Sequence, residues 1–445
     1  FRNEGNVMTD TLQRQLGVGT ATAMVISGMI AVGIFLVPAG MAKSLGSPLL
    51  LLIIWALMAG MALSGALCYG ELASRFPHAG GGYIYLRETY GPQIAFLYGW
   101  KSMLVLDPGL TALLGMGLAE YANSLFNLGL NGMQVAAITV ILILAGVNMV
   151  GVRFGAWLVQ WITIFKVGVL AFIALWAFGF GLGDWSNFLP FVDQRPGSAP
   201  LFPNALAGGF VGAFFAFAGW WDVSKLAGEV RNPERTLPRA LVLAVAVVTT
   251  TYIVTSAAFM YLVPVEDITS DRTFAAQAGR ILFGRSGEVI FASIVIVSVL
   301  GSITGTLMAM PRVYYAMARD GVFLNFAGVI HHRFGTPSRA ISIQAVLASI
   351  YVMLGTFDQV MALIIFIAVV FIALTVIGVF ILRRRSDETP PYSTPLYPIT
   401  PIIFLILVTI LLLLLGGDSP VQAGLGICVV FAGIPVYHLV FKKKA

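Results

Sequence analysis

The chain has 445 residues, of which 58% are apolar and only 10% are charged, and its mean hydropathy is +0.91. Soluble domains contain about 45–50% apolar and about 25% charged residues, so this composition excludes a water-soluble enzyme. The net charge of +6 does not indicate a nucleic-acid partner, because Lys and Arg gather at the ends of apolar stretches, where membrane proteins need them. The 2 cysteines and 4 histidines are scattered, so we expect neither a metal site nor a cofactor.

Long apolar stretches divide the chain, and a bilayer crossing needs about 20 apolar residues. Twelve stretches are long enough to be candidates: 20–43, 47–73, 93–122, 132–150, 155–180, 204–228, 237–263, 280–316, 338–355, 358–382, 399–416 and 421–441. The stretch 280–316 exceeds one bilayer thickness, so we expect a helix that is tilted or extends into the cytoplasm. The pattern predicts an all-α integral membrane protein with twelve transmembrane helices, and this size suits a transporter.

Lys and Arg are distributed unevenly over the connections between these stretches. If the N-terminus lies inside, most of the 26 Lys and Arg residues fall in inner connections. Positive residues are enriched on the cytoplasmic side of membrane proteins. The bias therefore predicts that the N- and C-termini are both cytoplasmic.

The first and sixth apolar stretches each contain small residues and then an aromatic residue in mid-stretch. These segments are Gly28–Phe35 and Phe215–Trp220. Helices that are interrupted at corresponding positions of two halves indicate an inverted-repeat transporter with its substrate site near the membrane midplane. Glycine also allows membrane helices to pack closely, so packing alone is the alternative interpretation.

At these residues the sequence resembles the amino acid–polyamine–organocation (APC) superfamily, most closely its L-type amino acid transporter-like branch, which includes bacterial permeases. The resemblance covers nearly the whole chain. Four motifs carry it in order: Gly33-Ile34-Phe35 with Pro38; Tyr69–Leu72 through Arg75–Pro77 to Gly80–Tyr83; Gly228–Arg235 with Leu237–Ala240; and Arg312 with Tyr314–Gly321.

The resemblance implies a LeuT-like fold, a five-plus-five inverted repeat in which helices 1 and 6 are discontinuous. The first repeat is expected over 18–180 (helices 1–5), the second over 204–382 (helices 6–10), and helices 11 and 12 over 399–441, all within one domain of residues 1–445. Two positions depart from the family pattern. Ala31-Val32 stand where the signature usually has Gly-Ser, and Trp221 stands where many members carry Asn or an acid. Because of both departures, the identity of the substrate is left open.

An amino acid zwitterion near the midplane needs donors for its carboxylate and acceptors for its ammonium group. If the first helix unwinds around Ala31–Gly33, the free amides that begin its outer half supply the donors. If the sixth helix unwinds at Ala216–Gly219, the carbonyls that end its first half supply the acceptors. The candidate substrate-binding residues are Ile30, Ala31, Val32, Gly33, Ile34, Asp107, Phe215, Ala216, Phe217, Ala218 and Gly219.

Three residues are candidates for gates. Phe215 matches the family's gating aromatic residue and is expected to cover the occupied site and exclude water. The alternative is an ordinary packing phenylalanine. Glu71 and Glu229 stand at predicted cytoplasmic helix ends beside basic residues, where either an inner-gate network or ordinary surface ion pairs fit.

Lys166 lies about eleven residues into the fifth predicted helix, hence roughly 16 Å deep. A cation at this depth is costly and therefore indicates function. The resemblance implies that its ammonium group replaces the sodium ion that sodium-coupled relatives hold beside the unwound first helix, with Ser302 and Thr304 as neighbouring oxygen donors. The alternatives are a lysine that snorkels to the interface and hydroxyls that only bond the preceding helical turn.

Asp107 lies about 22 Å along the third predicted helix from Pro92, within the hydrocarbon region. Lys101 is a poor partner, because six residues rotate it by about 240°. The resemblance places Asp107 where an anion-selective relative carries a basic residue that faces the substrate side chain. The reversed sign predicts that Asp107 receives a cationic side chain or binds the coupling proton. The alternatives are an ion pair with Lys166 and a protonated acid bonded to a carbonyl.

These observations predict Na⁺-independent amino acid transport by alternating access, as an exchanger (antiporter) in the cell inner membrane. A proton-coupled symporter is the alternative mechanism. An integral-membrane enzyme would need an interfacial cluster of His, Asp or Glu, and a channel would need polar rings or a filter loop. Neither is visible in the sequence, so no enzyme activity is expected. The expected partners are the amino acid substrate and the lipid bilayer, without an accessory subunit, and the oligomeric state is left open.

Overall fold

The computed structural model describes residues 12–31, 33–192, 202–264, 274–354, 357–385, 389–418 and 420–441. Within these ranges the chain is almost entirely helical, and its one β-bridge joins Leu16 to Val230. The helical elements up to residue 188 are α1 (Val18–Met29), α2 (Gly33–Leu45), α3 (Pro48–Arg75), α4 (Gly82–Tyr90), α5 (Pro92–Lys101), the π-helix η1 (Ser102–Leu106), α6 (Asp107–Phe126), α7 (Gly129–Val150), α8 (Val152–Gly179) and the 3₁₀-helix η2 (Trp185–Phe188).

The remaining elements follow the same pattern of long helices joined by short connections. They are α9 (Phe202–Phe217), the 3₁₀-helix η3 (Trp220–Glu229), α10 (Pro233–Leu262), α11 (Phe274–Phe283), the 3₁₀-turn η5 (Gly284–Ser286), α12 (Gly287–Ala309), α13 (Pro311–Arg319), the 3₁₀-turn η6 (Asn325–Gly328), α14 (Ser338–Leu354), α15 (Phe357–Arg385), α16 (Ile399–Asp418), α17 (Pro420–Val436) and the π-helix η7 (Tyr437–Phe441).

Ten helical segments of the described residues are long and apolar enough to cross a membrane. The chain is therefore a multi-pass, all-helical membrane protein, as its composition predicts. Two of the twelve predicted stretches are not among these ten. The stretch 20–43 is divided between α1 and α2, and α14 has 17 residues.

The predicted single helix over 280–316 is wrong. Instead α11 ends at Phe283, η5 turns the chain, and α12 begins at Gly287 beside α11. Gly284 has φ +64°, a conformation that glycine adopts without strain. A sharp helical hairpin thus replaces the expected tilted helix, and Pro311 begins α13 as a separate element.

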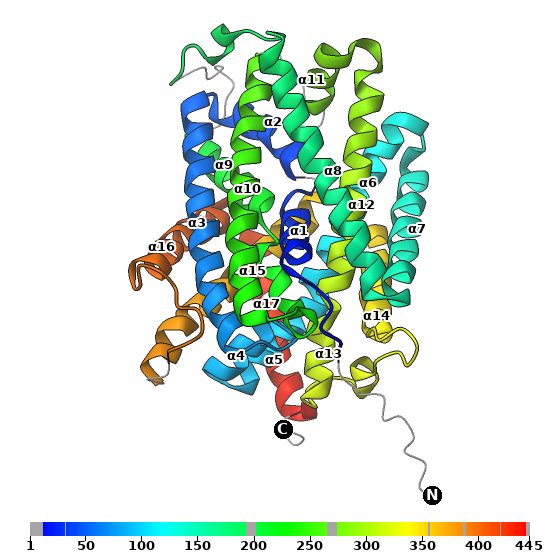
Figure 1. The fold of residues 1–445 in the computed structure, drawn as a ribbon, viewed down its shortest axis with the longest axis vertical. Helices are drawn as coiled ribbons and strands as arrows, with labels where there is room; N and C mark the ends of the chain where they lie inside the picture. The colour runs from blue at the N-terminus through cyan, green and yellow to red at the C-terminus, as the bar shows by residue number, and fades with distance from the viewer. Residues whose placement is uncertain are drawn as a thin grey trace, which may run out of the picture.

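Figure 1 shows α1 in the middle of the molecule, and it packs against α8, α10, α12 and η3. The segment before α1 reaches the same end of the molecule as α4, α13 and the helix that closes the chain, whereas α2 and α11 lie at the opposite end (Figure 1). The described parts nearest the two termini therefore share one end. This arrangement is what the uneven distribution of Lys and Arg predicts for the termini.

Candidate functional site

Two helices are interrupted, and their interruptions lie against each other. The α-helix α1 ends at Met29 and α2 begins at Gly33, whereas α9 ends at Phe217 and η3 begins at Trp220. A Cβ atom on Gly33 would lie 2.8 Å from the Ala216 Cα atom. The backbones of the two interruptions are therefore in direct contact, which only a residue without a side chain allows.

A second contact joins the other halves of the two interrupted helices, α1 and the start of η3. A Cβ atom on Gly219 would lie 3.1 Å from the Gly28 carbonyl, and Gly219 itself has φ +96°. Glycine at both positions lets α1 and the start of η3 meet without a side chain between them. Of the other candidates, Ile30 and Ile34 are buried and Ala31 is partly buried, whereas Val32 lies outside the described residues.

Tyr252 of α10 connects the two interruptions. Its buried hydroxyl lies 2.7 Å from Met29 O and 2.8 Å from Ala216 O, the carbonyls near the ends of α1 and α9. The hydroxyl has one proton, which it can donate to one of the two carbonyls at a time. Tyr252 thus bridges two helix ends whose carbonyls have no regular i+4 amide partner. The sequence offered no signal for it, because Tyr252 is one of several hydroxyl-bearing residues in the middle of α10.

Lys166 of α8 is fully buried and donates into a shell of protein oxygens. Its Nζ lies 2.6 Å from Ile30 O, 3.2 Å from both Ser27 O and Ser27 Oγ, 3.3 Å from Ser298 O and 3.2 Å from Ser302 Oγ. All five oxygens are neutral. A small monovalent cation bound at the end of α1 would need the same kind of neutral oxygen ligands that here surround the ammonium group of Lys166.

The structure brings Ser302, but not Thr304, to Lys166. Ser302 Oγ lies 2.7 Å from Ser27 O, whereas Thr304 donates to Leu300 O in its own helix. Thr304 therefore follows the alternative of bonding the preceding turn. Lys166 does not snorkel, because its ammonium group points at α1 and α12 inside the protein. Ser27 and Ser298 were missed, since serines are common in these helices.

Asp107 pairs with Lys225, not with Lys166. Lys225 Nζ lies 3.4 Å from Asp107 Oδ1 and 2.8 Å from Asp222 Oδ1. Lys225 stands near the inner end of the predicted stretch 204–228, yet its side chain is 1% exposed. The sequence signal was Asp222 and Lys225 at i, i+3 within an apolar segment.

Lys101 and Asp107 flank the π-helix η1, which widens the turn between them. Lys101 is buried, and its Nζ lies 4.3 Å from the centre of the Tyr98 ring and 5.4 Å from that of Phe371. Cation–π contacts of this kind stabilise a partly desolvated ammonium group. The described residues place no carboxylate within 4.0 Å of Lys101, in agreement with the rotation predicted for an Asp107 partner.

Phe215 is partly buried against the hydrophobic core and lies just before the interruption of α9. The Phe217 ring packs between Trp55 and Tyr252, so this residue faces α3 and α10 and offers the site only its backbone. Ala216 is buried and Ala218 is partly buried.

Glu71 and Glu229 form buried ion pairs, so the surface alternative is wrong for both. Glu229 receives two bonds from Arg312, at 2.7 and 3.2 Å, and both side chains are 1% exposed. Glu71 is paired with Arg383 and Arg75 and accepts from the Thr394 amide. Removing one partner of such a pair leaves an uncompensated buried charge.

The ion pair of Arg87 and Asp320 joins α4 to the end of α13 at the same end of the molecule. Tyr83 donates to the same carboxylate at 2.8 Å. Burial, followed by the Asp320 charge, raises the pKa of Tyr83 well above its usual range, so its hydroxyl remains a donor.

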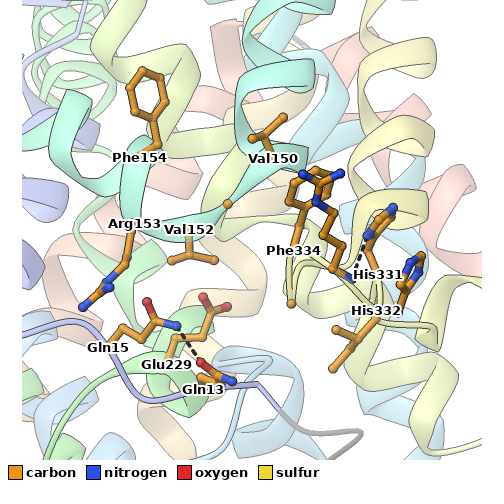
Figure 2. A pocket seen from close by; sticks show the side chains of 14 residues that line it. Gln13, Gln15, Val150, Val152, Arg153, Phe154, Glu229, His331, His332 and Phe334 are labelled. Carbon is orange, nitrogen blue, oxygen red and sulfur yellow. Dashed lines mark hydrogen bonds between the residues drawn. The ribbon is translucent and has the colours of Figure 1, made fainter. Parts of the chain in front are cut away.

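A cavity of about 600 Å³ opens beside Glu229. Its lining comes from the segment before α1 (Gln13 and Gln15), from the start of α8 (Val152 and Arg153) and from the connection after α13 (His331 and Phe334), as Figure 2 shows. The segment before α1 is fixed there, because the amides of Gln15 and Leu16 both donate to Glu229 O at 2.8 and 2.9 Å. The cavity thus lies at the ends of α1, α8 and η3, the elements that carry the interruptions and Lys166.

Two interrupted helices in contact, with a buried lysine at their junction, are the arrangement expected of a membrane transporter. A family model described as amino acid permease matches residues 16–434, and the chain belongs to this family. The resemblance seen in the sequence is therefore confirmed.

Characterised proteins that are similar over most of the chain include the following three. The chain is 31% identical to the serine/threonine exchanger SteT of Bacillus subtilis over 98% of both chains. It is 28% identical to the human cystine/glutamate transporter over 97% of this chain and 87% of that one. It is 29% identical to the human b(0,+)-type amino acid transporter 1 over 91% of this chain and 84% of that one.

The first prediction concerns Lys166→Ala. The change removes the closest donor of Ile30 O, at about 1–3 kcal/mol, whereas Ser27 O keeps the hydroxyl of Ser302. We expect transport in proteoliposomes to fall at least about tenfold, since about 1.4 kcal/mol is tenfold, while the protein still elutes as a single species. Lys43→Ala, at an exposed lysine, is the control. Normal transport by the Lys166 variant would exclude a functional role.

The second prediction concerns Gly33→Ala. The added methyl group meets Ala216 at 2.8 Å and must push α2 away from α9. We expect a loss of about 1–3 kcal/mol of stability, as for other overpacked sites, and reduced transport. Gly60→Ala, where nothing lies within 4 Å, is the matched control. Thermal unfolding in detergent compares the stability of the two variants, and serine transport in liposomes compares their activity. Equal melting temperatures of the two variants would contradict the close contact.

Proposed function

We propose that the chain exchanges amino acids across the membrane by alternating access at the junction of the two interrupted helices. The contact between Gly33 and Ala216, with Lys166 beside it, carries the proposal. The family match supports amino acid transport, and relatives named as exchangers support antiport. A permease family also favours transport over enzyme activity.

The substrate backbone is proposed to bind to helix ends. The amides that begin α2 at Gly33 and Ile34, with those of Ala31 and Val32, receive the carboxylate. The carbonyls at 216–219 receive the ammonium group. Phe215 is proposed to close over the occupied site.

Sodium independence is proposed because Lys166 already supplies a positive charge to the carbonyls at the end of α1. Binding a sodium ion there would bring two cations onto the same neutral oxygens. Ser302 is proposed to assist Lys166, and the role predicted for Thr304 has no support from its contact with Leu300.

Small neutral amino acids are the proposed substrates. Asp107 already faces the ammonium group of Lys225, so it has less attraction for a cationic side chain. The relative that is named a serine/threonine exchanger supports the same choice. Proton-coupled symport is the second candidate, because the other oxygen of Asp107 is buried without a hydrogen-bond partner among the described residues.

The proposed architecture is LeuT-like, with twelve membrane helices, repeats over 18–180 and 204–382, and helices 11 and 12 over 399–441. Its support is that α1–α2 and α9–η3 are the first helices of the two repeats, and both are interrupted. We further propose an inner-membrane location, cytoplasmic termini and transport by the chain alone.

The third prediction tests exchange. Purified protein in liposomes should accumulate labelled serine only when serine is preloaded, and replacing Na⁺ with choline at fixed pH should leave the rate unchanged. A panel of amino acids then ranks the substrates. Equal uptake into empty liposomes would indicate a symporter or channel, and a severalfold loss in choline would contradict the role of Lys166.

The fourth prediction concerns the gate. Phe215→Ala should lower turnover severalfold, because the occupied site is left open to water, whereas Phe215→Trp should keep partial activity. Phe154→Ala, at an exposed phenylalanine, is the control. If Phe215→Ala has wild-type kinetics of serine counterflow, the residue is only a packing element.

A further inference from the structure

Two lysines and two aspartates gather inside the protein where α5, α6 and η3 meet. Asp107 is 0% exposed, Lys225 is 1% exposed and Asp222 is 13% exposed. Lys101 is also buried and interacts electrostatically with the other three. So many ionisable groups are expensive in a membrane interior, which makes the cluster a candidate for function.

The charges of this cluster are unevenly matched. Lys225 lies closer to Asp222, at 2.8 Å, than to Asp107, at 3.4 Å. Asp107 Oδ2 is buried with no hydrogen-bond partner among the described residues. An ionised Asp107 thus has one long contact with the ammonium group of Lys225, whereas a protonated Asp107 carries no net charge that needs compensation.

A suitable acceptor for that proton lies beside the same carboxylate. Tyr314 of α13 is buried and interacts with Asp107 through its hydroxyl group. This hydroxyl can serve both protonation states of the acid, because it donates to Oδ2 when Asp107 is ionised and accepts from Oδ2 when Asp107 is protonated.

The two sides of the cluster belong to different parts of the proposed transport machinery. Lys225 and Asp222 both stand on η3, directly after the interruption at Gly219, whereas Asp107 begins α6. When η3 moves, Lys225 can leave with Asp222 as a neutral pair. Asp107 stays behind, and its surroundings change from dry protein to water.

We propose that Asp107 is a proton-binding site: Oδ2 holds a proton while η3 is docked as in this structure and releases it when η3 moves and water enters. The inference rests on the proposed exchange function, because the alternation of η3 opens the site. The proton therefore makes occlusion pH-dependent, and a low pH favours the docked state.

The charged and titratable groups around Asp107 are few. It is faced by Lys101 and Tyr98 of α5, Lys225 and Asp222 of η3, and Tyr314 of α13. The neighbouring helix α7 contains no titratable residue, and those of α12, α14 and α15 stand near the helix ends. Among them Tyr351 donates to Leu104 O in η1. Lys101 is the rival proton carrier.

The test uses the full chain in liposomes. Labelled serine, or the best substrate of the panel, is exchanged at equal internal and external pH between about 5 and 9. We expect the wild-type rate to change severalfold with pH, and Asp107→Asn, which mimics the protonated acid, to lose this dependence while still exchanging. Lys225→Met removes the nearby cation, so the midpoint should move up by about one pH unit or more. Glu120→Gln, on the same helix, should keep the wild-type profile.

A second readout measures protons directly. Adding substrate to the purified protein in weakly buffered detergent should change the number of bound protons by up to about one per wild-type chain, because substrate shifts the balance between docked and open η3, and should change it by none in Asp107→Asn. The proposal is overturned if Asp107→Asn keeps the wild-type pH profile, or if only Lys101→Gln loses it. If the wild-type protein exchanges substrate at the same rate at every pH, the proton site is overturned but the proposed exchange function stands. Absence of counterflow for every amino acid would overturn the proposed function itself.

Discussion

A backbone group that leaves a helix inside a membrane must find its partner within the protein, because no water is available there. The interruptions of α1 and α9 create such groups twice, and the close contact of Gly33 with Ala216 puts both sets in one region. Donors then have to come from intact helices. Lys166 of α8 and Tyr252 of α10 supply them, and both side chains are fully buried for that reason.

The same constraint explains how the interrupted helices are held by the others. The segment before α1 and the end of η3 are joined by the bridge of Leu16 with Val230. Besides apolar packing, buried charged side chains hold this pair of segments: Lys166 of α8 donates to α1, and Arg312 of α13 pairs with Glu229 of η3. Buried ion pairs add little net stability, because desolvation offsets their attraction. Contacts of this kind separate at lower cost than apolar packing once water reaches them, which suits a carrier that must open.

Much of this arrangement could be predicted from the sequence, and the failures have physical causes. The interruptions were visible because small residues in two corresponding stretches are a local pattern, and Lys166 was visible because its depth alone makes a cation costly. Partners were not visible, since pairing depends on how helices rotate against each other. Asp107 was therefore given Lys166 as a possible partner, whereas the 3₁₀ geometry of η3 directs Lys225 to it. The hairpin at Gly284 was missed although Gly284–Gly287 is a turn signal, because the apolar residues of the two helices outweigh this short polar segment.

The two buried lysines near the interruptions have opposite electrostatic settings. Lys166 is surrounded by neutral oxygens that belong mostly to backbone, so its surroundings have no charge to gain or lose. Lys225 stands between two carboxylates, so the charge around it depends on protonation. A cation among neutral oxygens serves as a constant tether for α1. Lys225 can change its carboxylate partners when η3 moves, because Asp222 moves with it and Asp107 does not. The fixed charge thus holds the first interrupted helix from outside, on α8, whereas the variable charge lies on the second interrupted helix itself, in η3.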